Sequence, residues 1–552
     1  KEKEKKKSIP IGITDFGDMI NEEYYYVDKT KLIEDLLENK QKVTVFTRPR
    51  WFGKTLNLSM LSWFFDIRKA PRSKGLFQGL YIENSPYFSE LGKYPTLTVT
   101  FRDSKALTPE KAVRNIYRIV FDLLNKMSYV YERLSPGSKK IYDSLFESSE
   151  SIFLDNALKY LSQFLYEYYN QKVVILIDEY DAPIITAFEN GYFEEAGEFF
   201  RNLYCSAIKN NEYLHFGVLA GAMRVSREDI FSGMPNLQAN SILHRGFEGN
   251  FGFTEEEVHQ ALKYYELLEF ADDVREWYDG YHFGDETVYN PWMVLNYLKA
   301  ECLEPYWISA ADNFIVNTML DLSDYRHFRK AVPLFGGIGF RYAIDKHKNF
   351  DKLIRQNDIW SLLLYSGYLT AEGNPGDSAW LLKIPNKELT SFFEDAFLDK
   401  LGGIEKCEFQ RFVTALENGR IMGYRSFSYY LQEFFLSHSK AAAGCKESFY
   451  HAFMLVLILS LRNDYTCYSE DEQSLGRVDV ILEPKDKKKP AYIFGFKVAE
   501  SKNDMDIVLE LAFAQLDSKE YKEKLTAKGI KKILAVGITC YDNEIKVKHK
   551  TL

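Results

Sequence analysis

A run of apolar residues that ends in two carboxylates constrains this chain more than any other feature. Residues 173–177 read Val-Val-Ile-Leu-Ile, and Asp178 and Glu179 follow directly. Such a run predicts a strand buried on both faces, which is typical of parallel sheets covered by helices. Because α/β proteins bind ligands at the carboxyl ends of their strands, we expect Asp178 and Glu179 to lie at a ligand site.

A phosphate-binding loop is predicted about 120 residues upstream. A strand pattern at 42–47 leads through a short loop into Gly53-Lys54-Thr55, and a helix pattern covers 56–65. We expect Lys54 to reach the outer phosphates of a nucleotide, Thr55 to bind Mg²⁺, and backbone N–H groups to cradle the anion. A Gly-Lys-Thr triplet can also stand by chance at a helix start. Its combination with Asp178-Glu179 favours a nucleotide-binding ATPase core.

The loop departs from the usual G-x-x-x-x-G-K-[ST] spacing, because Arg48 stands where the first glycine is expected. A missing glycine limits the backbone geometries open to the loop. We expect Arg48 and Arg50 to offset this by adding positive charge beside the phosphates. The predicted nucleotide-binding residues of the loop are Arg48, Pro49, Arg50, Trp51, Phe52, Gly53, Lys54 and Thr55.

The predicted catalytic roles follow from phosphoryl-transfer chemistry. Asp178 is expected to hold Mg²⁺ through water, and Glu179 to orient or deprotonate the attacking water. A third buried strand is predicted at 214–220 and ends at Ala220, so a polar side chain that senses the γ-phosphate is not expected there. Candidates for a γ-phosphate contact, in cis or from a neighbouring subunit, are Arg224, Arg227 and Arg245.

Size and composition bound the remaining possibilities. The chain has 552 residues, which suggests two to four domains, and its 46% hydrophobic content predicts a folded protein. A net charge of -9 argues against a surface uniformly adapted to nucleic acid. The six cysteines form no C-x-x-C pair, and no apolar stretch reaches membrane-spanning length without charges. A reduced cytoplasmic protein without a membrane span is therefore expected.

Two downstream regions have patterns of their own. Thr254 and Glu257 predict a capping box, and we expect a helical lid at about 250–300 whose aromatic clusters serve packing or, alternatively, base stacking. Further on, strands are predicted at 478–482, 491–498 and 533–538, with a helix at about 504–525. Residues 484–552 contain 15 Lys, no Arg and 10 Asp and Glu, a local charge of +5. Either a nucleic-acid surface or a solvated lysine face is compatible with that charge.

Four motifs together resemble bacterial AAA-ATPase-like proteins that carry a C-terminal domain of the PD-(D/E)XK nuclease superfamily. The motifs are the loop 48–55, Ile177-Asp178-Glu179-Tyr180-Asp181, Arg224-Val225-Ser226 through Ile230-Phe231-Ser232-Gly233, and Trp277-Tyr278-Asp279-Gly280-Tyr281. The resemblance covers roughly 8–300 and 405–552. It implies an α/β fold in which a P-loop NTPase parallel sheet with a helical lid precedes a small restriction-endonuclease-like domain. The implied layout is a charged tail (1–8), the ATPase domain (9–250), a winged-helix-like lid (251–300), a helical linker (301–404) and a degenerate nuclease-like domain (405–552).

The resemblance also implies a remnant of a nuclease site. Asp479 matches the metal-binding aspartate, Lys497 matches the lysine of the (D/E)-x-K element, and Gln515 and Tyr521 resemble family positions on the following helix. Gly495 stands where the second carboxylate is expected, so metal affinity and cleavage should be lost. Carboxylates that could compensate are Glu447, Glu483 and Glu500.

Three functions remain open on this basis. The first is a Mg²⁺-dependent ATP-hydrolysing protein coupled to a nuclease-fold domain that has lost cleavage. The second is a nucleotide-gated scaffold for DNA or protein with little turnover, and the third is an active ATP-dependent nuclease. Expected cofactors are ATP and Mg²⁺. Expected partners are DNA or RNA at the C-terminal domain and, in a homo-oligomer, further copies of the chain.

Overall fold

The computed structural model of the chain divides into two compact units. Unit 1 comprises 1–311 and 344–378, and unit 2 comprises 312–343 and 379–552. The structure describes residues 6–209, 211–223, 237–307, 325–346, 353, 356, 358–373, 377–438, 447–469, 479–514, 516, 519–542 and 544–552. Each unit is α/β and has its own five-stranded sheet.

Unit 1 is built on a parallel sheet with the strand order β2-β3-β4-β1-β5. The strands are β2 (Thr96–Thr100), β3 (Val173–Asp178), β4 (Leu214–Gly221), β1 (Val43–Thr47) and β5 (Leu237–Asn240). Every residue of β1 and β3 is buried, as the apolar runs in the sequence predict. β4 lies between β1 and β3, so the strand before the phosphate loop and the strand before Asp178-Glu179 are not neighbours.

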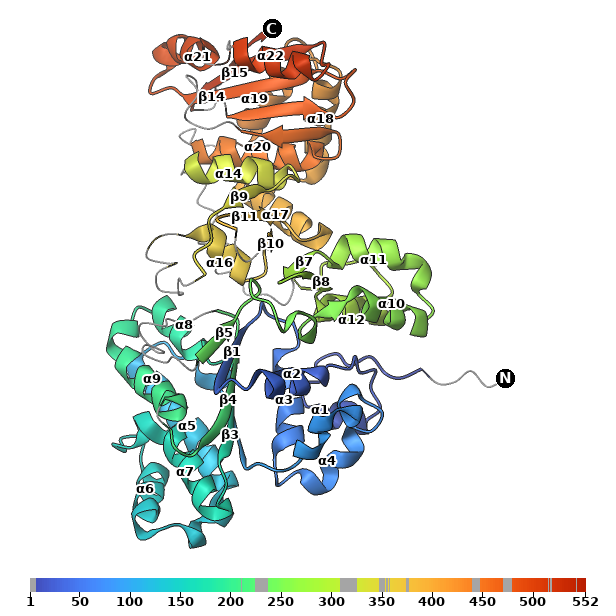
Figure 1. The fold of residues 1–552 in the computed structure, drawn as a ribbon. Helices are drawn as coiled ribbons and strands as arrows, with labels where there is room; N and C mark the ends of the chain where they lie inside the picture. Colours follow the sequence, from blue (N-terminus) through green and yellow to red (C-terminus); the bar gives the residue numbers. More distant parts are fainter. Residues whose placement is uncertain are drawn as a thin grey trace. The chain divides into compact units, whose positions relative to one another are not determined.

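Helices cover both faces of this sheet (Figure 1). On one face are α1 (Phe16–Asn21), α2 (Lys31–Asn39), α3 (Lys54–Phe65) and α4 (Ala70–Leu76). On the other are α5 (Pro109–Lys126), α6 (Pro136–Glu147), α7 (Ala157–Tyr169), α8 (Ala182–Glu189) and α9 (Phe193–Ile208). The apolar side chains of this second layer and of the sheet form one continuous core.

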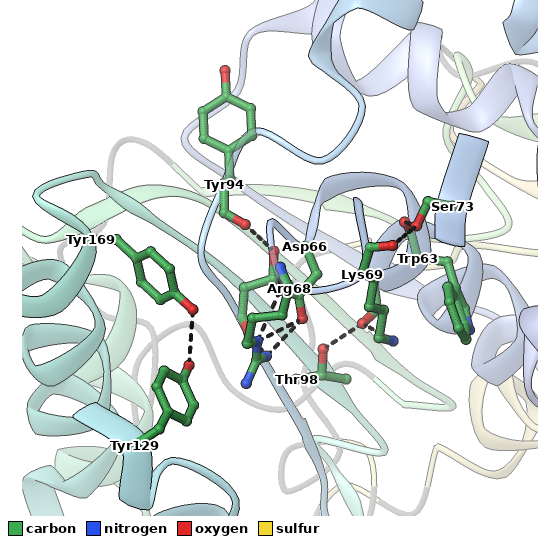
Figure 2. A network of polar contacts seen from close by, with 11 residues as sticks. Trp63, Asp66, Arg68, Lys69, Ser73, Tyr94, Thr98, Tyr129 and Tyr169 are labelled. Atoms are coloured by element: carbon green, nitrogen blue, oxygen red, sulfur yellow. Dashed lines mark hydrogen bonds and ion pairs between the residues drawn. The ribbon is translucent and has the colours of Figure 1, made fainter. Parts of the chain in front are cut away.

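A buried polar network fixes the end of α3 to the edge strand β2 (Figure 2). Asp66, the C-cap residue of α3, is 1% exposed and accepts hydrogen bonds from the guanidinium and the backbone N–H of Arg68. Arg68 also donates to the carbonyl oxygen of Thr96 at 2.8 Å. Bidentate guanidinium–carboxylate pairs hold a defined geometry, so α3 is anchored at the end opposite the phosphate loop.

Three helices and a small antiparallel sheet follow the main sheet in unit 1. The helices are α10 (Glu255–Tyr264), α11 (Ala271–Tyr278) and α12 (Pro291–Ala300), and the strands are β6 (Phe253–Thr254), β8 (Glu286–Tyr289) and β7 (Tyr281–Phe283). Thr254 and Glu257 form the predicted capping box at the start of α10. The aromatic segments 277–281 and 289–292 end α11, contribute to β7 and β8, and begin α12. Unit 1 is completed by α16 (Ile359–Tyr365) and β10 (Thr370–Glu372).

Unit 2 contains a mixed sheet with the order β12-β13-β14-β15-β16, in which only β14 and β15 pair in parallel. Its strands are β12 (Tyr465–Tyr468), β13 (Val480–Pro484), β14 (Ala491–Val498), β15 (Ile533–Tyr541) and β16 (Glu544–Thr551). The antiparallel strands β9 (Phe340–Tyr342) and β11 (Trp380–Lys383) pair with each other outside this sheet. Its helices are α14 (Tyr325–Phe335), α17 (Lys387–Lys400), α18 (Gln410–Glu417), α19 (Phe427–Ser437), α20 (Glu447–Leu461), α21 (Met505–Ala514) and α22 (Lys519–Ala527). The single helix predicted at 504–525 is thus two helices.

Two further expectations concern cysteines and membranes. Cys205, Cys302, Cys407 and Cys467 are free thiols, whereas Cys540 is disulfide-bonded, which departs from the expectation of a fully reduced chain. Within the described ranges, none of the helices combines the length and the apolar character needed to cross a membrane.

Candidate functional site

The predicted phosphate loop and the predicted acidic strand end meet at one point of unit 1. α3 begins at Lys54, and Gly53 before it adopts the left-handed conformation with φ +80°. The hydroxyl group of Thr55 donates to Oδ2 of Asp178 at 2.7 Å, across 123 positions of sequence. A hydroxyl and a carboxylate are hard oxygen donors of the kind that Mg²⁺ prefers. The two sequence motifs therefore form one site.

Lys54 occupies the centre of the loop. Its ammonium group donates to the carbonyl oxygens of Arg48 and Pro49 at 2.9 and 2.8 Å. Burial lowers the pKa of Lys54 to about 8, although the neighbouring carboxylates of Asp181, Asp178 and Glu179 favour its charged form. The ammonium group is thus held inside the loop by two backbone carbonyl oxygens.

Arg48 does not lie where the sequence analysis expects it. Its guanidinium is completely buried and donates to the backbone carbonyl oxygens of Thr47 and Asn240 and to the side-chain oxygen of Asn240. The guanidinium also stacks over the rings of Phe251 and Phe283, 5.0 and 5.2 Å from their centroids. Arg48 thus ties the loop to β5, and the prediction that its charge faces the phosphates is wrong. Because Arg48 is not among the residues with positive φ, this loop needs no glycine there.

The tip of the loop packs against the helices and strands that follow the main sheet. Phe52 is buried against the rings of Tyr281 and Phe283 in β7, with centroids 5.0 and 4.9 Å away. Trp51 has φ +69°, is 39% exposed, and lies 4.4 Å from the ring of Trp292 at the start of α12. These aromatic residues therefore support the loop, as the packing interpretation predicts. Arg50, which directly precedes Trp51 and Phe52, is exposed.

The two acidic residues at the end of β3 differ in environment. Burial raises the pKa of Asp178, against the effect of its hydrogen bond from Thr55 and of the charge on Lys54. Glu179 has φ +50°, an uncommon conformation for a residue with a side chain, and its carboxylate pairs with Nε of Arg102 at 3.2 Å. Arg102 also lies 3.4 Å from the Thr55 hydroxyl.

Sequence reasoning missed two residues of this site, Arg102 and Asp181. Arg102 comes two residues after the end of β2, so the rule that ligands bind at strand ends could have found it. Asp181 belongs to the same acidic run as Asp178 and Glu179 and is 3% exposed. Its carboxylate accepts hydrogen bonds from the backbone N–H groups of Ala222 and Met223 at the end of β4.

Of the three arginines predicted to contact a γ-phosphate, the structure describes Arg245. Arg245 forms an exposed ion pair with Asp285, with Nε and Oδ2 2.6 Å apart. Arg224 and Arg227 lie outside the described residues. Ala220 pairs with Asp178 in the register of β3 and β4, so the strand position beside the acidic pair carries only a methyl group.

The nuclease-like remnant lies in unit 2. Asp479 is buried, and its carboxylate accepts a hydrogen bond from the backbone N–H of Phe496. Gly495 pairs with Gly537 across β14 and β15, where α21 packs on the sheet. A Cβ atom at Gly495 would lie 2.9 Å from the side chain of Leu516. The position expected for a second carboxylate is therefore filled by packing.

The candidate replacements for that carboxylate do not complete a metal site among the described residues. Glu483 forms ion pairs with Lys528 and Lys487, at 2.6 and 3.4 Å, and Glu500 is exposed. Lys497 is half-buried, while Gln515 and the side chain of Glu447 lie outside the described residues. In the part of the chain that the structure describes, no group of three or more His, Cys, Asp and Glu is arranged to hold a metal ion.

Comparison with known proteins agrees with this layout. Residues 10–231 match the model of a family described as "Predicted AAA-ATPase", and residues 445–550 match that of the PD-(D/E)XK nuclease superfamily. The chain is 26% identical over 546 residues to a protein of Azotobacter chroococcum mcd 1 named "Uncharacterized protein in vnfD 5'region". The match covers 95% of both chains. The resemblance stated from the motifs is confirmed.

Proposed function

We propose that this chain, in which an AAA-ATPase-like segment precedes a PD-(D/E)XK nuclease-superfamily segment, hydrolyses ATP with Mg²⁺ and has lost nuclease activity. The main support for ATP hydrolysis is the 2.7 Å hydrogen bond between the Thr55 hydroxyl and the Asp178 carboxylate. It brings together the two oxygen donors that P-loop ATPases use around the metal ion.

Each residue of the site has a defined part in the proposed reaction. Thr55 and Asp178 would hold Mg²⁺, Asp178 through water, and the ion when bound neutralises charge on the phosphates. Lys54 leaves the carbonyl oxygens of the loop and binds the outer phosphates. Arg50, exposed at the loop tip, is the arginine of the loop suited to a γ-phosphate contact. Glu179 orients the attacking water and accepts its proton.

Glu179 must give up its ion pair before it can act on water. Its carboxylate pairs with Arg102 in the nucleotide-free protein, and the same guanidinium lies near the Thr55 hydroxyl. Bound phosphates would compete with Glu179 for the guanidinium of Arg102, and Mg²⁺ held by Thr55 and Asp178 would add positive charge to the site. We therefore propose that nucleotide binding moves Arg102 away from Glu179 and completes the catalytic arrangement.

The proposed loss of cleavage rests on the packing in unit 2. Mg²⁺-dependent nucleases need two carboxylates around the scissile phosphate. Gly495 supplies none, and a methyl carbon of Leu516 lies only 2.9 Å from the place that a Cβ atom would take there. Asp479, the carboxylate that remains, is engaged by the backbone of β14.

A nucleotide-gated scaffold is the second candidate. The pairing of Glu179 with Arg102 and the methyl group of Ala220 beside Asp178 both favour slow turnover. As such a scaffold, the chain would lie in the cytoplasm, bind DNA or RNA through unit 2 and associate with further copies of itself. Lys546 and Lys548, on β16, pair with Asp506 and Glu510 of α21, which favours the solvated interpretation of these lysines over a nucleic-acid surface.

Steady-state ATP hydrolysis with Mg²⁺, with and without DNA, tests the proposal on wild type, Lys54→Ala and Glu179→Gln. Glu179→Gln should lose about 10- to 1000-fold in turnover and keep nucleotide binding, whereas Lys54→Ala should lose binding. Turnover unchanged in Glu179→Gln would exclude its role as base. Binding without turnover in wild type would favour the scaffold. Mg²⁺-dependent DNA cleavage that Asp479→Ala abolishes would refute the loss of nuclease activity.

A further inference from the structure

The end of β4 is held by a single buried carboxylate from the neighbouring strand end. Oδ2 of Asp181 accepts hydrogen bonds from the backbone N–H groups of Ala222 and Met223, at 2.8 and 2.7 Å. The Tyr180 hydroxyl donates to the carbonyl oxygen of Met223 at 2.8 Å. Both polar groups of Met223 and the N–H of Ala222 are therefore engaged by the acidic motif.

The fit around this carboxylate leaves no room for a side chain on the strand. A Cβ atom at Gly221 would lie 2.5 Å from Oδ1 of Asp181 and 2.6 Å from the Tyr180 ring. Gly221 has an ordinary backbone conformation rather than a positive φ. Close approach of Asp181, and not backbone freedom, is thus the reason that glycine fits here.

The same segment is bonded to the phosphate loop. The backbone N–H of Arg48 donates to the carbonyl oxygen of Gly221 at 3.1 Å. The carbonyl oxygen of Arg48 accepts a hydrogen bond from the ammonium group of Lys54. A chain of hydrogen bonds therefore runs from Asp181 through the end of β4 to Lys54. Movement of residues 221–223 would move the carbonyl oxygens that hold this lysine.

We propose that Asp181 is a positioning residue of the nucleotide site, which holds the end of β4 against the phosphate loop and balances the charge of Lys54 until phosphates replace it. The predicted effect on nucleotide binding rests on the proposed ATPase function. The two hydrogen bonds that Asp181 accepts from residues 222 and 223, which we call its grip on the β4 end, are independent of that function. Asp181 touches neither phosphate nor water in this scheme and acts through Lys54 and the β4 end.

The charge and the grip of Asp181 make different predictions. A carboxylate near the site repels the phosphates, so removing its charge alone should strengthen nucleotide binding by about threefold to tenfold. Removing the grip should misplace the loop, and a displacement of about 1 Å can cost about 100-fold in rate. A residue that only stabilises the fold would not strengthen binding when neutralised.

Three substitutions in the full chain separate the two effects. Asp181→Asn keeps an oxygen acceptor for both N–H groups and removes the charge, and Asp181→Ala removes both. Gly221→Ala keeps the charge and forces the contacts apart. Gly217→Ala on the same strand is the matched control, because a Cβ atom there would meet nothing closer than 3.6 Å.

Amide hydrogen exchange at residues 222 and 223 in the nucleotide-free protein and the Kd and kcat for Mg²⁺-ATP are the measurements. We expect exchange to rise at least about tenfold in Asp181→Ala and Gly221→Ala, with kcat falling about 10- to 100-fold. Asp181→Asn should retain slow exchange and bind ATP more tightly, and Gly217→Ala should match wild type.

Slow exchange in both Asp181→Ala and Gly221→Ala would overturn the grip, whether or not the protein binds ATP. Wild-type affinity in Asp181→Asn would overturn the charge effect. Absence of nucleotide binding in the wild-type protein would refute the proposed function and the charge effect, and the exchange measurement would still decide the grip.

Discussion

Replacing Arg48 by glycine restores the usual spacing of the phosphate loop, and we expect it to destabilise the protein. The change removes three hydrogen bonds of a buried guanidinium, to Thr47 and Asn240, with donor–acceptor distances of 2.7 to 3.0 Å. Hydrogen bonds of a charged group contribute about 1.5–3 kcal/mol each. The cost of burying the charge offsets part of this sum, and each buried oxygen acceptor left unpaired costs about 1–3 kcal/mol.

Chemical denaturation followed by tryptophan fluorescence is the suitable assay for Arg48→Gly. Six of the seven tryptophans belong to unit 1, so the signal reports mainly on the unit that contains the substitution. Arg50→Gly is the matched control, since Arg50 is exposed and two residues away. We expect the free energy of unfolding to fall by about 3–5 kcal/mol in Arg48→Gly and by less than about 1 kcal/mol in the control. Equal stability of Arg48→Gly and wild type would refute a net stabilising role for these bonds.

Three further predictions concern the two units. Arg102→Ala frees the Glu179 carboxylate, so steady-state ATP turnover should rise about twofold to fivefold, and unchanged or lower turnover would contradict the inhibitory role of the pair. Because burial lowers the pKa of Lys54 to about 8, its ammonium group is charged below that pH and neutral above it. Equilibrium ATP affinity should therefore weaken as pH rises through 8 and, if Lys54 is responsible, hold steady in Lys54→Arg. Gly495→Glu should destabilise unit 2 by about 1–3 kcal/mol through its clash with Leu516, and DNA cleavage gained by this variant would show that the space is not closed.

The strands and motifs of the site could be predicted because their signals are local. The apolar run at 173–177 predicts a doubly buried strand wherever the rest of the chain goes, and Gly53-Lys54-Thr55 lies at the start of a helix as expected. The matches to both family models could be anticipated because each motif behind the resemblance is a short contiguous stretch of sequence. The acidic pair and the loop meet because parallel strands end at one edge of the sheet.

The orientation of Arg48 could not be predicted, because it depends on a distant residue. Its partner Asn240 is 192 positions away in β5, and nothing near Arg48 in sequence distinguishes a buried guanidinium from one that faces phosphate. Gly495 could be identified as a lost ligand, but its tight packing depends on Leu516 and on the adjacent Gly537. Contacts of this kind arise only when separate elements pack.

The path of the chain through unit 1 limits how its parts can be recombined. The chain leaves unit 1 near residue 311 and returns to it for 344–378, where the carbonyl oxygen of Gly367 accepts a hydrogen bond from Tyr281. The AAA-ATPase-like match ends at 231, yet Phe52 of the phosphate loop packs on β7 beyond that point. No single crossover between genes can therefore exchange one unit whole. A joint before residue 378 divides unit 1, a joint at 378 leaves residues 312–343 of unit 2 behind, and a complete exchange of unit 2 requires three joints.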